Sequence, residues 1–252
     1  MIFKHKKSLG QNFLKAPHVL EKICYSSELK ETDVVLEIGP GKGTLTQKLL
    51  EKAGRVVAVE KDNRLIEELS DKFKDLELLN EDILLFNPSD HNLNKGEYKI
   101  VANIPYYITG MILEKFLSAE NHPKSMTLMV QKEVARRIIA TDKKESLLSI
   151  SVKAYGEPKY IDTVKKELFT PKPKVDSAIL HIQNISKDRF LNTNVSESKF
   201  FETVKKGFMH KRKKLSNNLE TSKEFLESIG LNGDIRAENL SVDDWFEVSK
   251  SI

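Results

Sequence analysis

The chain has 252 residues, of which 39% are apolar and 31% charged, so it can bury a sizeable core, and disorder is excluded as its main state. No apolar run reaches the roughly 18 residues that a membrane span needs, and the lysine-bearing N-terminus lacks the apolar segment of a secretory signal. The single cysteine, Cys24, cannot form an internal disulfide, and no Cys/His cluster indicates zinc. We therefore expect a reduced, cytoplasmic protein that binds neither metal nor membrane.

The net charge of +4 is distributed unevenly along the chain. Residues 1–15 carry four lysines and no acidic residue, and residues 199–216 carry seven basic residues against one acidic residue. Residues 217–252 are acidic, with eight acidic and three basic residues. Two short basic segments favour a polyanionic partner such as nucleic acid. An ordinary solvated face is the alternative.

The predicted elements begin near residue 33 and alternate between β-branched runs and amphipathic segments. Strands are expected where short runs are apolar, at 34–38, 56–59, 76–79, 100–102 and 126–130. Helices are expected where apolar residues recur every three or four positions, around 45–50, 65–69, 111–117 and 133–139. Alternation of this kind predicts a doubly wound, mostly parallel α/β sheet.

The alternation ends after residue 145. Three further strands are predicted without full helices between them, at 147–152, 160–164 and 177–182, and an antiparallel edge of the same sheet would account for them. Residues 184–196 are polar and lack periodicity, which predicts a linker, and residues 199–252 have the pattern of short helices. We therefore predict an α/β domain at 1–184 and a small all-α domain at 185–252.

A glycine-rich turn from Gly39 to Gly43 joins the first strand to the first helix. Glycines there let a ligand approach the backbone and expose amide groups of the helix N-terminus, although tight strand–helix turns also need glycine. The second strand supplies the stronger signal, because it ends in Glu60, 21 residues after Gly39. A carboxylate at that position can accept hydrogen bonds from both hydroxyls of a ribose.

An acidic residue before the turn, Glu37, makes this loop less suited to phosphates than to a cofactor with a positive centre. S-adenosylmethionine, a sulfonium with an amino-acid tail, is such a cofactor. Asp82, at the end of the third strand, is expected to accept from the adenine amino group, while Ile83 packs against the ring. In isolation Asp82 would more often be a turn or cap residue, so its interpretation depends on its position next to Glu60.

The segment Asn103-Ile104-Pro105-Tyr106 follows the fourth strand at the same edge of the sheet. An exocyclic amine is a weak nucleophile because its lone pair is delocalised into the aromatic ring. Acceptors that hold its N–H groups out of plane, here the Asn103 side-chain oxygen and the Ile104 carbonyl, would make it more nucleophilic. Pro105 fixes the bend and Tyr106 offers a face for stacking, so positioning is the main catalytic contribution. A plain strand-end turn is the alternative.

A base inside a paired helix must be flipped out before it can enter such a pocket. A second stacking face would help to hold it, and Phe169 is the candidate. The alternative is a core phenylalanine before a rigid, proline-containing turn. Lys172 and Lys174 follow in the same loop and lie close enough in sequence to meet phosphates.

Several ordered blocks of the sequence together resemble the KsgA group of small-subunit ribosomal RNA adenine dimethyltransferases, which are related to the Erm enzymes. They cover nearly the whole chain, at 9–14, 37–43, 103–107, 131–137, 169–177, 210–219 and 236–241. The resemblance implies a Rossmann-like class I methyltransferase with a mostly parallel seven-stranded sheet and a small all-α C-terminal domain. It also implies methyl transfer from S-adenosylmethionine to N6 of two adjacent adenosines near the 3′ end of 16S rRNA, during biogenesis of the 30S subunit.

The resemblance also completes the set of expected site residues. The family's cofactor contacts add two positions near the N-terminus, so the expected cofactor site is Asn12, Leu14, Gly39, Gly41, Glu60, Lys61, Asp82, Ile83 and Asn103. The expected catalytic residues are Asn103, Ile104, Pro105, Tyr106 and Phe169, with the flipped adenine between the two aromatic rings. RNA contacts are expected from Lys4, Lys6, Lys7, Lys172, Lys174, Lys211, Arg212, Lys213 and Lys214. The expected partner is small-subunit rRNA or a precursor of the 30S subunit, bound by a monomer.

Two alternatives remain. An Erm enzyme would perform the same chemistry on a large-subunit adenosine, and Ile104 is Erm-like. Tyr107, which stands where Erm enzymes usually carry Asn, and a basic helix ending at Leu219 favour the small-subunit group, as does the closing block at 236–238. The other alternative is a nucleic-acid-binding protein that keeps the cofactor site but no longer catalyses, as mitochondrial transcription factors of this superfamily do. Intact catalytic positions argue against it: Asn103, Tyr106 and Phe169.

Overall fold

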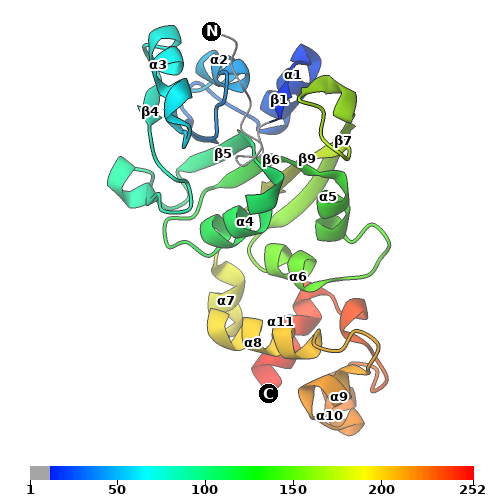
Figure 1. Ribbon diagram of the computed structural model, residues 1–252. Coiled ribbons are helices and arrows are strands. Elements are labelled where there is room, and N and C mark those ends of the chain that lie inside the picture. Colours follow the sequence, from blue (N-terminus) through cyan, green and yellow to red (C-terminus); the bar gives the residue numbers. More distant parts are fainter. Residues whose placement is uncertain (1–11) are drawn as a thin grey trace. The chain divides into compact units, whose positions relative to one another are not determined.

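The computed structural model describes residues 12–252, whose contacts group into two compact units (Figure 1). The first unit runs up to Ala135 and also includes Lys159–Ile185. The second unit consists of Arg136–Pro158 and Ser186–Ile252. The predicted domains, 1–184 and 185–252, stay a prediction, and the compact units differ from them in that residues 136–158 join the second unit.

A seven-stranded, mostly parallel sheet confirms the predicted α/β fold. Its strand order is β4-β3-β2-β5-β6-β9-β7, in which neighbouring strands from β4 to β6 are parallel and β9 is antiparallel to β6. The strands are β2 (Val34–Ile38), β3 (Arg55–Val59), β4 (Glu77–Leu79), β5 (Tyr98–Asn103), β6 (Ser125–Gln131), β7 (Glu157–Val164) and β9 (Ser177–Gln183). The central strands are almost continuously buried because helices cover both faces of the sheet.

Helices on the two sides of the sheet supply the rest of the first unit's core. On one side lie α1 (Pro17–Ser26), α2 (Thr44–Leu50) and α3 (Asn63–Lys72), and on the other lies α4 (Thr109–Leu117) (Figure 1). Apolar residues of α1 and α2 pack on side chains of the sheet in one buried cluster. The remaining elements are α5 (Lys132–Ile139), which begins in the first unit and ends in the second, and the 3-10 helices η2 (Pro88–His91), η3 (Tyr106–Ile108) and η4 (Lys166–Leu168).

A separate two-stranded sheet pairs β1 (Phe13–Leu14) with β8 (Phe169–Thr170). The strands are antiparallel, and Leu14 lies opposite Phe169. Both side chains are buried in the core that α1 and α2 form with the large sheet. This pairing joins two segments far apart in the sequence.

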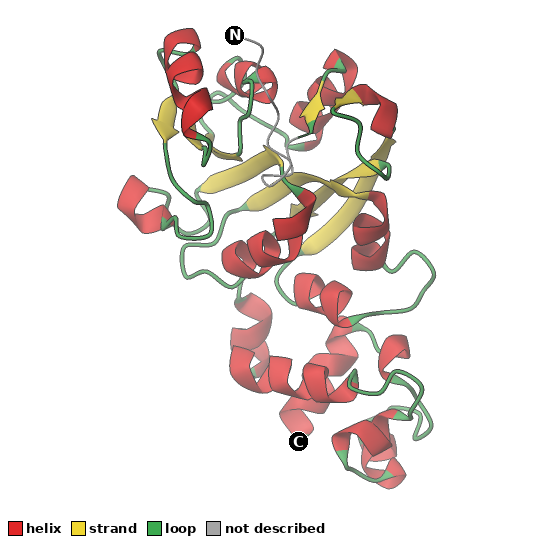
Figure 2. Ribbon diagram, in the orientation of Figure 1, coloured by secondary structure: helices red, strands yellow, loops and turns green. Residues whose placement is uncertain are grey.

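The second unit is built mainly of helices (Figure 2). They are α6 (Leu147–Lys153), α7 (Asp188–Thr193), α8 (Glu197–Gly207), α9 (Leu215–Leu219), α10 (Lys223–Ser228), α11 (Val242–Ser251) and the 3-10 helix η5 (Ala237–Asn239). Its core is aromatic: the rings of Phe200 and Phe246 stack with centroids 4.3 Å apart, and Phe190 meets Phe200 edge-on at 5.5 Å.

Three predictions in this region were wrong. The strand predicted at 147–152 is the helix α6, because Ser146 and Ser149 form a capping box that starts a helix. The linker predicted at 184–196 contains α7, which is held by the buried ring of Phe190. The basic helix is a loop from residue 208 to 214, and the helix α9 begins only at Leu215.

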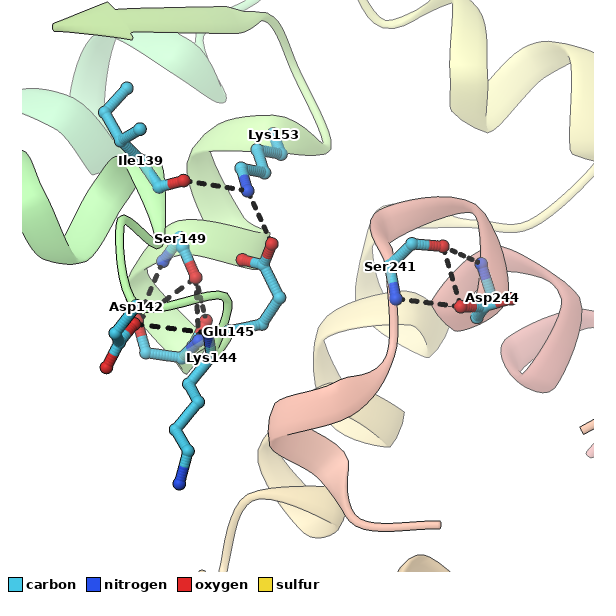
Figure 3. A network of polar contacts seen from close by, with 9 residues as sticks. Ile139, Asp142, Lys144, Glu145, Ser149, Lys153, Ser241 and Asp244 are labelled. Atoms are coloured by element: carbon cyan, nitrogen blue, oxygen red, sulfur yellow. Dashed lines mark hydrogen bonds and ion pairs between the residues drawn. The ribbon is translucent and has the colours of Figure 1, made fainter. Parts of the chain in front are cut away.

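Polar contacts fix the loop between α5 and α6 (Figure 3). Lys153 Nζ donates to the carbonyl of Ile139 at 3.4 Å and forms an ion pair with Glu145 at 2.5 Å. The backbone N–H of Glu145 donates to the carbonyl of Glu238 at 2.8 Å, which ties this loop to η5. A second capping box begins α11 in the same figure, formed by Ser241 and Asp244.

Candidate active site

A cavity of about 200 Å³ opens at the carboxyl ends of β2, β3, β4 and β5. Parallel strands bring these ends to one edge of the sheet, which is where ligands bind in open α/β folds. Every predicted cofactor-binding residue and four of the five predicted catalytic residues belong to its wall: Asn12, Leu14, Gly39, Gly41, Glu60, Lys61, Asp82, Ile83, Asn103, Ile104, Pro105 and Tyr106. The structure thus brings both predicted sets together, while their roles stay predictions.

The glycine turn combines left-handed backbone with close packing. Gly39 and Gly41 have φ angles of +65° and +60°, which side chains rarely adopt. A Cβ on Gly41 would lie 2.7 Å from the ring of Phe13, whereas one on Gly39 would meet nothing within 4 Å. The N–H of Gly39 donates to the carbonyl of Val59 at 2.9 Å, so the turn is tied to the end of β3. The backbone at Gly39 is therefore both fixed and open toward the cavity.

Two carboxylates at neighbouring strand ends share the cavity wall with this turn. Glu60, directly after β3, is 7% exposed and accepts from the backbone N–H groups of Asp62 at 2.8 Å and Gly41 at 3.2 Å. Burial raises the pKa of Glu60. Asp82, which follows β4, pairs with Lys61 Nζ at 2.6 Å, and this hydrogen bond lowers the pKa of Asp82.

A third carboxyl group, that of Glu37, lies in the cavity wall within β2. It is 1% exposed, and burial raises its pKa to about 8; the hydroxyl of Thr46 beside it acts in the opposite direction, and the neighbouring Glu60 raises the pKa further. Its Oε2 has no hydrogen-bond partner among residues 12–252. A buried carboxyl group with an open oxygen fits a ligand that brings positive charge into the cavity, because that charge would compensate the desolvation of the carboxylate.

The Asn103–Tyr106 segment is held by contacts at both ends. Asn103 Nδ2 donates to the carbonyl of Asn12 at 3.1 Å, which leaves Oδ1, the oxygen that the predicted role of Asn103 uses, as the atom that can accept. The hydroxyls of Tyr106 and Ser177 are hydrogen-bonded at 2.5 Å. Burial raises the pKa of Tyr106. The ring of Tyr106 is thereby anchored through its far end.

Phe169 is the predicted catalytic residue that lies outside this cavity wall. It is 3% exposed and packs in the core, where it pairs with Leu14 across β1 and β8. In this conformation it matches the alternative interpretation, a core phenylalanine. Its role as a stacking face stays a prediction.

Several wall residues were missed by sequence reasoning, and most of them are apolar: Phe13, Leu20, Leu45, Leu84, Tyr107, Ile108 and Met111. Two of these carried a usable signal, because Tyr107 directly follows the Asn103–Tyr106 segment and Met111 lies four positions further along. The others contact the cavity through chain folding that no local pattern shows.

The predicted RNA-binding residues differ in whether they already form an ion pair within the protein. Lys172 pairs with Glu167 and Lys214 with Asp234, each at 2.8 Å. Four others are exposed and form no ion pair within the described part of the chain, namely Lys174, Lys211, Arg212 and Lys213. The remaining three, Lys4, Lys6 and Lys7, lie outside the described residues.

Within residues 12–252, no group of three or more His, Cys, Asp and Glu side chains could hold a metal ion. None of the helices described here is long and apolar enough to span a bilayer. Cys24 is buried, and burial raises its pKa to about 11, which keeps it a thiol.

The strand order, the antiparallel β9 beside β6 and the acidic cavity at the strand ends define a protein of the class I methyltransferase type. The sequence profile of the ribosomal RNA adenine dimethylase family matches residues 2–252, and the chain belongs to this family. Membership confirms the resemblance found in the sequence. The chemistry of the family implies S-adenosylmethionine as the methyl donor.

Individual relatives agree with this assignment. The ribosomal RNA small subunit methyltransferase A of Dehalococcoides mccartyi is 42% identical over 253 residues, which cover 96% of this chain and 86% of that protein. A dimethyladenosine transferase from Plasmodium falciparum has a similar structure, with a TM-score of 0.80 at 28% identity over 94% of this chain and 95% of that one. The 23S rRNA methyltransferase ErmE is also similar, with a TM-score of 0.77 at 25% identity over 95% and 98% of the two chains.

Proposed function

We propose that the protein transfers methyl groups from S-adenosylmethionine to N6 of adenines in small-subunit ribosomal RNA. The observation that carries the proposal is that one cavity contains both parts of the required chemistry. Its wall holds carboxylates suited to a cationic cofactor and the Asn103–Tyr106 segment suited to an exocyclic amine. Similarity to a small-subunit methyltransferase over 96% of this chain supports the choice of RNA.

The acidic residues of the wall would hold the cofactor. Glu60 would accept from the ribose hydroxyls, Asp82 from the adenine amino group, and Glu37 would offer its unpaired oxygen to positive charge. When bound, the cofactor supplies an electrophilic methyl group. The residues present therefore fit S-adenosylmethionine, and the pair between Lys61 and Asp82 would have to adjust when adenine binds.

The target amine would be oriented by acceptors at the end of β5. Asn103 Oδ1 and the Ile104 carbonyl accept its N–H groups and direct the lone pair out of the ring plane. Tyr106, anchored on Ser177, presents its ring for stacking. No strong general base is needed, because the amine loses a proton readily once it is methylated. Catalysis then comes mainly from positioning and from exclusion of water.

The finer parts of the proposal concern the substrate. Two adjacent adenosines near the 3′ end of 16S rRNA receive the methyl groups, during assembly of the 30S subunit in the cytoplasm, and the protein acts as a monomer. The unpaired charges of Lys211, Arg212 and Lys213 contact phosphates of the RNA. Lys4, Lys6, Lys7, Lys172, Lys174 and Lys214 add to this contact.

Methyl transfer to isolated ribosomal particles tests the proposal. The purified protein and labelled S-adenosylmethionine are incubated with small-subunit particles that lack the modification, with large subunits and with mature 70S ribosomes. Primer extension then maps the methylated positions on both RNAs. We expect label at two adjacent adenosines of the small-subunit RNA. Label in large-subunit RNA would replace the proposal with an Erm-type activity, and cofactor binding without any transfer would favour the non-catalytic alternative.

A further inference from the structure

An exposed apolar patch borders the cavity. Its centre consists of Tyr107 and Met111, whose exposed fractions are 58% and 44%, and Leu85, which is 84% exposed, directly follows the wall residue Leu84. Tyr107 and Met111 also belong to the cavity wall, so the patch continues the wall outward into solvent. Large apolar side chains that stay exposed together beside a ligand site mark a binding surface.

Two segments of the first unit build the patch, and a hydrogen bond joins them. Met111 in the first turn of α4 and Lys115 one turn later are four residues apart, which puts them on one side of this helix, and Tyr107 in η3 shares the cavity wall with Met111. Lys115 Nζ donates to the carbonyl of Leu84 at 3.2 Å. This contact holds the loop after β4, and with it Leu85, next to that side of α4.

Positive charge accompanies the patch. Lys115 belongs to the segment just described, and Lys61 is part of the same cavity wall as Tyr107 and Met111. The Lys61 side chain is 59% exposed even though it pairs with Asp82. Aromatic and thioether side chains next to lysines are the combination that binds single-stranded nucleic acid, by stacking with bases and by contact with phosphates.

We infer that this patch, called here the neighbour-base patch, stacks with the base that adjoins the target adenine in the RNA strand. The inference rests on the proposed function and names a further contact of the same site. A base that is turned into the cavity leaves its neighbour with an unstacked face at the entrance. The ring of Tyr107 and the thioether of Met111 replace that lost stacking. Because two adjacent adenosines react, the patch holds one of them while the other occupies the cavity.

The first test is kinetic and uses the undermethylated small-subunit particles. Tyr107→Ala removes the stacking face, Tyr107→Phe keeps it, and Tyr25→Ala is the matched control, because Tyr25 is 86% exposed on α1 away from the cavity wall. We expect Tyr107→Ala to raise KM for the particles about tenfold, in line with the stacking of one base, with kcat largely retained. Tyr107→Phe and Tyr25→Ala should match the wild type. Binding of S-adenosylmethionine, measured by calorimetry, should be unchanged in Tyr25→Ala and should change less in Tyr107→Ala than KM for the particles does.

The second test observes stacking directly. A synthetic RNA hairpin carries two adjacent adenosines in its loop, and one of them is replaced by fluorescent 2-aminopurine, whose emission falls when it stacks. We expect quenching with the wild type and with Tyr107→Phe, and brighter emission with Tyr107→Ala. Met111→Ala should fall between them, and it tests the same patch if Tyr107→Ala does not fold.

The outcomes separate this inference from the proposed function. If the wild type methylates the particles while Tyr107→Ala and Met111→Ala have unchanged KM and unchanged quenching, the patch faces solvent and the inference is wrong. If the wild type methylates no ribosomal RNA, the proposed function is wrong. The hairpin fluorescence still reports in that case whether the patch stacks with a base.

Discussion

The two compact units of the molecule hold the ionisable groups of the proposed sites in opposite environments. In the first unit, the carboxyl groups of Glu37 and Glu60 are almost fully buried in the wall of a cavity. In the second, Lys211, Arg212 and Lys213 stay in solvent without an ion pair in the described chain. Buried charges act strongly on one ligand held in one geometry, because little water screens them. Exposed charges act on a polyanion by releasing its counterions and need no fixed geometry.

The cavity and the basic segment of the second unit also differ in how the backbone holds them. The cavity residues stand at the ends of parallel strands, whose register fixes them to one another. The basic loop, residues 208–214, instead lies between α8 and α9, and one side chain of α9 holds the start of this loop. Asn218, 6% exposed, donates through Nδ2 to the carbonyls of Gly207 at 2.6 Å and His210 at 3.2 Å. Changes in the cavity should therefore affect the chemical step, and changes in the loop should affect RNA affinity.

Asn103→Ala should have the largest effect. It removes the side-chain oxygen that orients the target amine, and loss of position at a reacting atom costs about a hundredfold or more in rate. We expect methyl transfer in single turnovers to fall by at least that factor, while affinity for S-adenosylmethionine falls only several-fold. Asn94→Ala is the matched control, because Asn94 is exposed and bonds only to Glu97 on the surface. Full activity of Asn103→Ala would contradict the mechanism.

Neutralising the basic loop should affect binding and leave the cavity intact. In Lys211→Gln/Arg212→Gln/Lys213→Gln, we expect RNA affinity near physiological salt to fall about tenfold to a hundredfold. The slope of log affinity against log salt should decrease by about 2 to 3, since each phosphate contact contributes about 0.7–0.9. Affinity for S-adenosylmethionine should not change.

Two further variants sharpen this measurement. Lys30→Gln/Lys95→Gln/Lys250→Gln removes the same number of exposed charges elsewhere and should leave the slope nearly unchanged. Lys214→Gln alone should have a smaller effect than any one of the three unpaired positions, because Lys214 already pairs with Asp234. An unchanged slope in the triple variant would mean that the loop faces solvent in the complex.

Much of the cavity could be predicted because parallel strands bring their carboxyl ends to one edge of the sheet. Residues that follow these strands in the sequence therefore lie close together in the fold. Once the strands were recognised, Gly39, Glu60, Asp82 and Asn103 had to meet at one edge of the sheet, although they are spread over 65 positions. Asn12 and Leu14 depended on the family resemblance, since their contact with the cavity comes from the pairing of β1 with β8.

What could not be predicted depends on contacts between distant segments. Burial of Phe169 follows from the same β1–β8 pairing, which no local pattern signals. Apolar and polar residues alternate from Leu147 to Val152 as they would in a strand. Only the capping box of Ser146 and Ser149 favours a helix. The basic run was correctly seen as charged, but whether each charge is free depends on partners such as Asp234, 20 residues from Lys214.

Asn218→Ala separates the shape of the basic loop from its charge. The substitution leaves the carbonyls of Gly207 and His210 without their donor and costs about 1–3 kcal/mol of unfolding free energy. We expect RNA affinity to fall several-fold as the loop loses its shape, with the salt slope unchanged because no charge is lost. Asn217→Ala, at an exposed neighbour in the same helix, is the control. A reduced salt slope in Asn218→Ala would show that shape and charge are not separable.

Glu37→Gln acts on stability, and its effect appears in how the unfolding free energy depends on pH. The folded protein holds the Glu37 proton up to a pKa of about 8, whereas an unfolded chain releases it near 4.5. Between these values the folded state binds the extra proton, so the wild type loses stability as pH rises, by up to about 1.4 kcal/mol per pH unit. Gln has no proton to lose and avoids this cost.

Urea unfolding of both proteins at pH 5, 6, 7 and 8 measures this difference. The unfolding free energy of Glu37→Gln should increase relative to that of the wild type at each step, whereas Glu31→Gln, at an exposed position, should run parallel to the wild type. The variant should also bind S-adenosylmethionine more weakly, because it cannot offer a carboxylate to the cofactor's positive charge. Parallel curves for Glu37→Gln and the wild type would mean that the Glu37 carboxyl group has the same pKa in the folded and the unfolded chain, so that burial does not act on it.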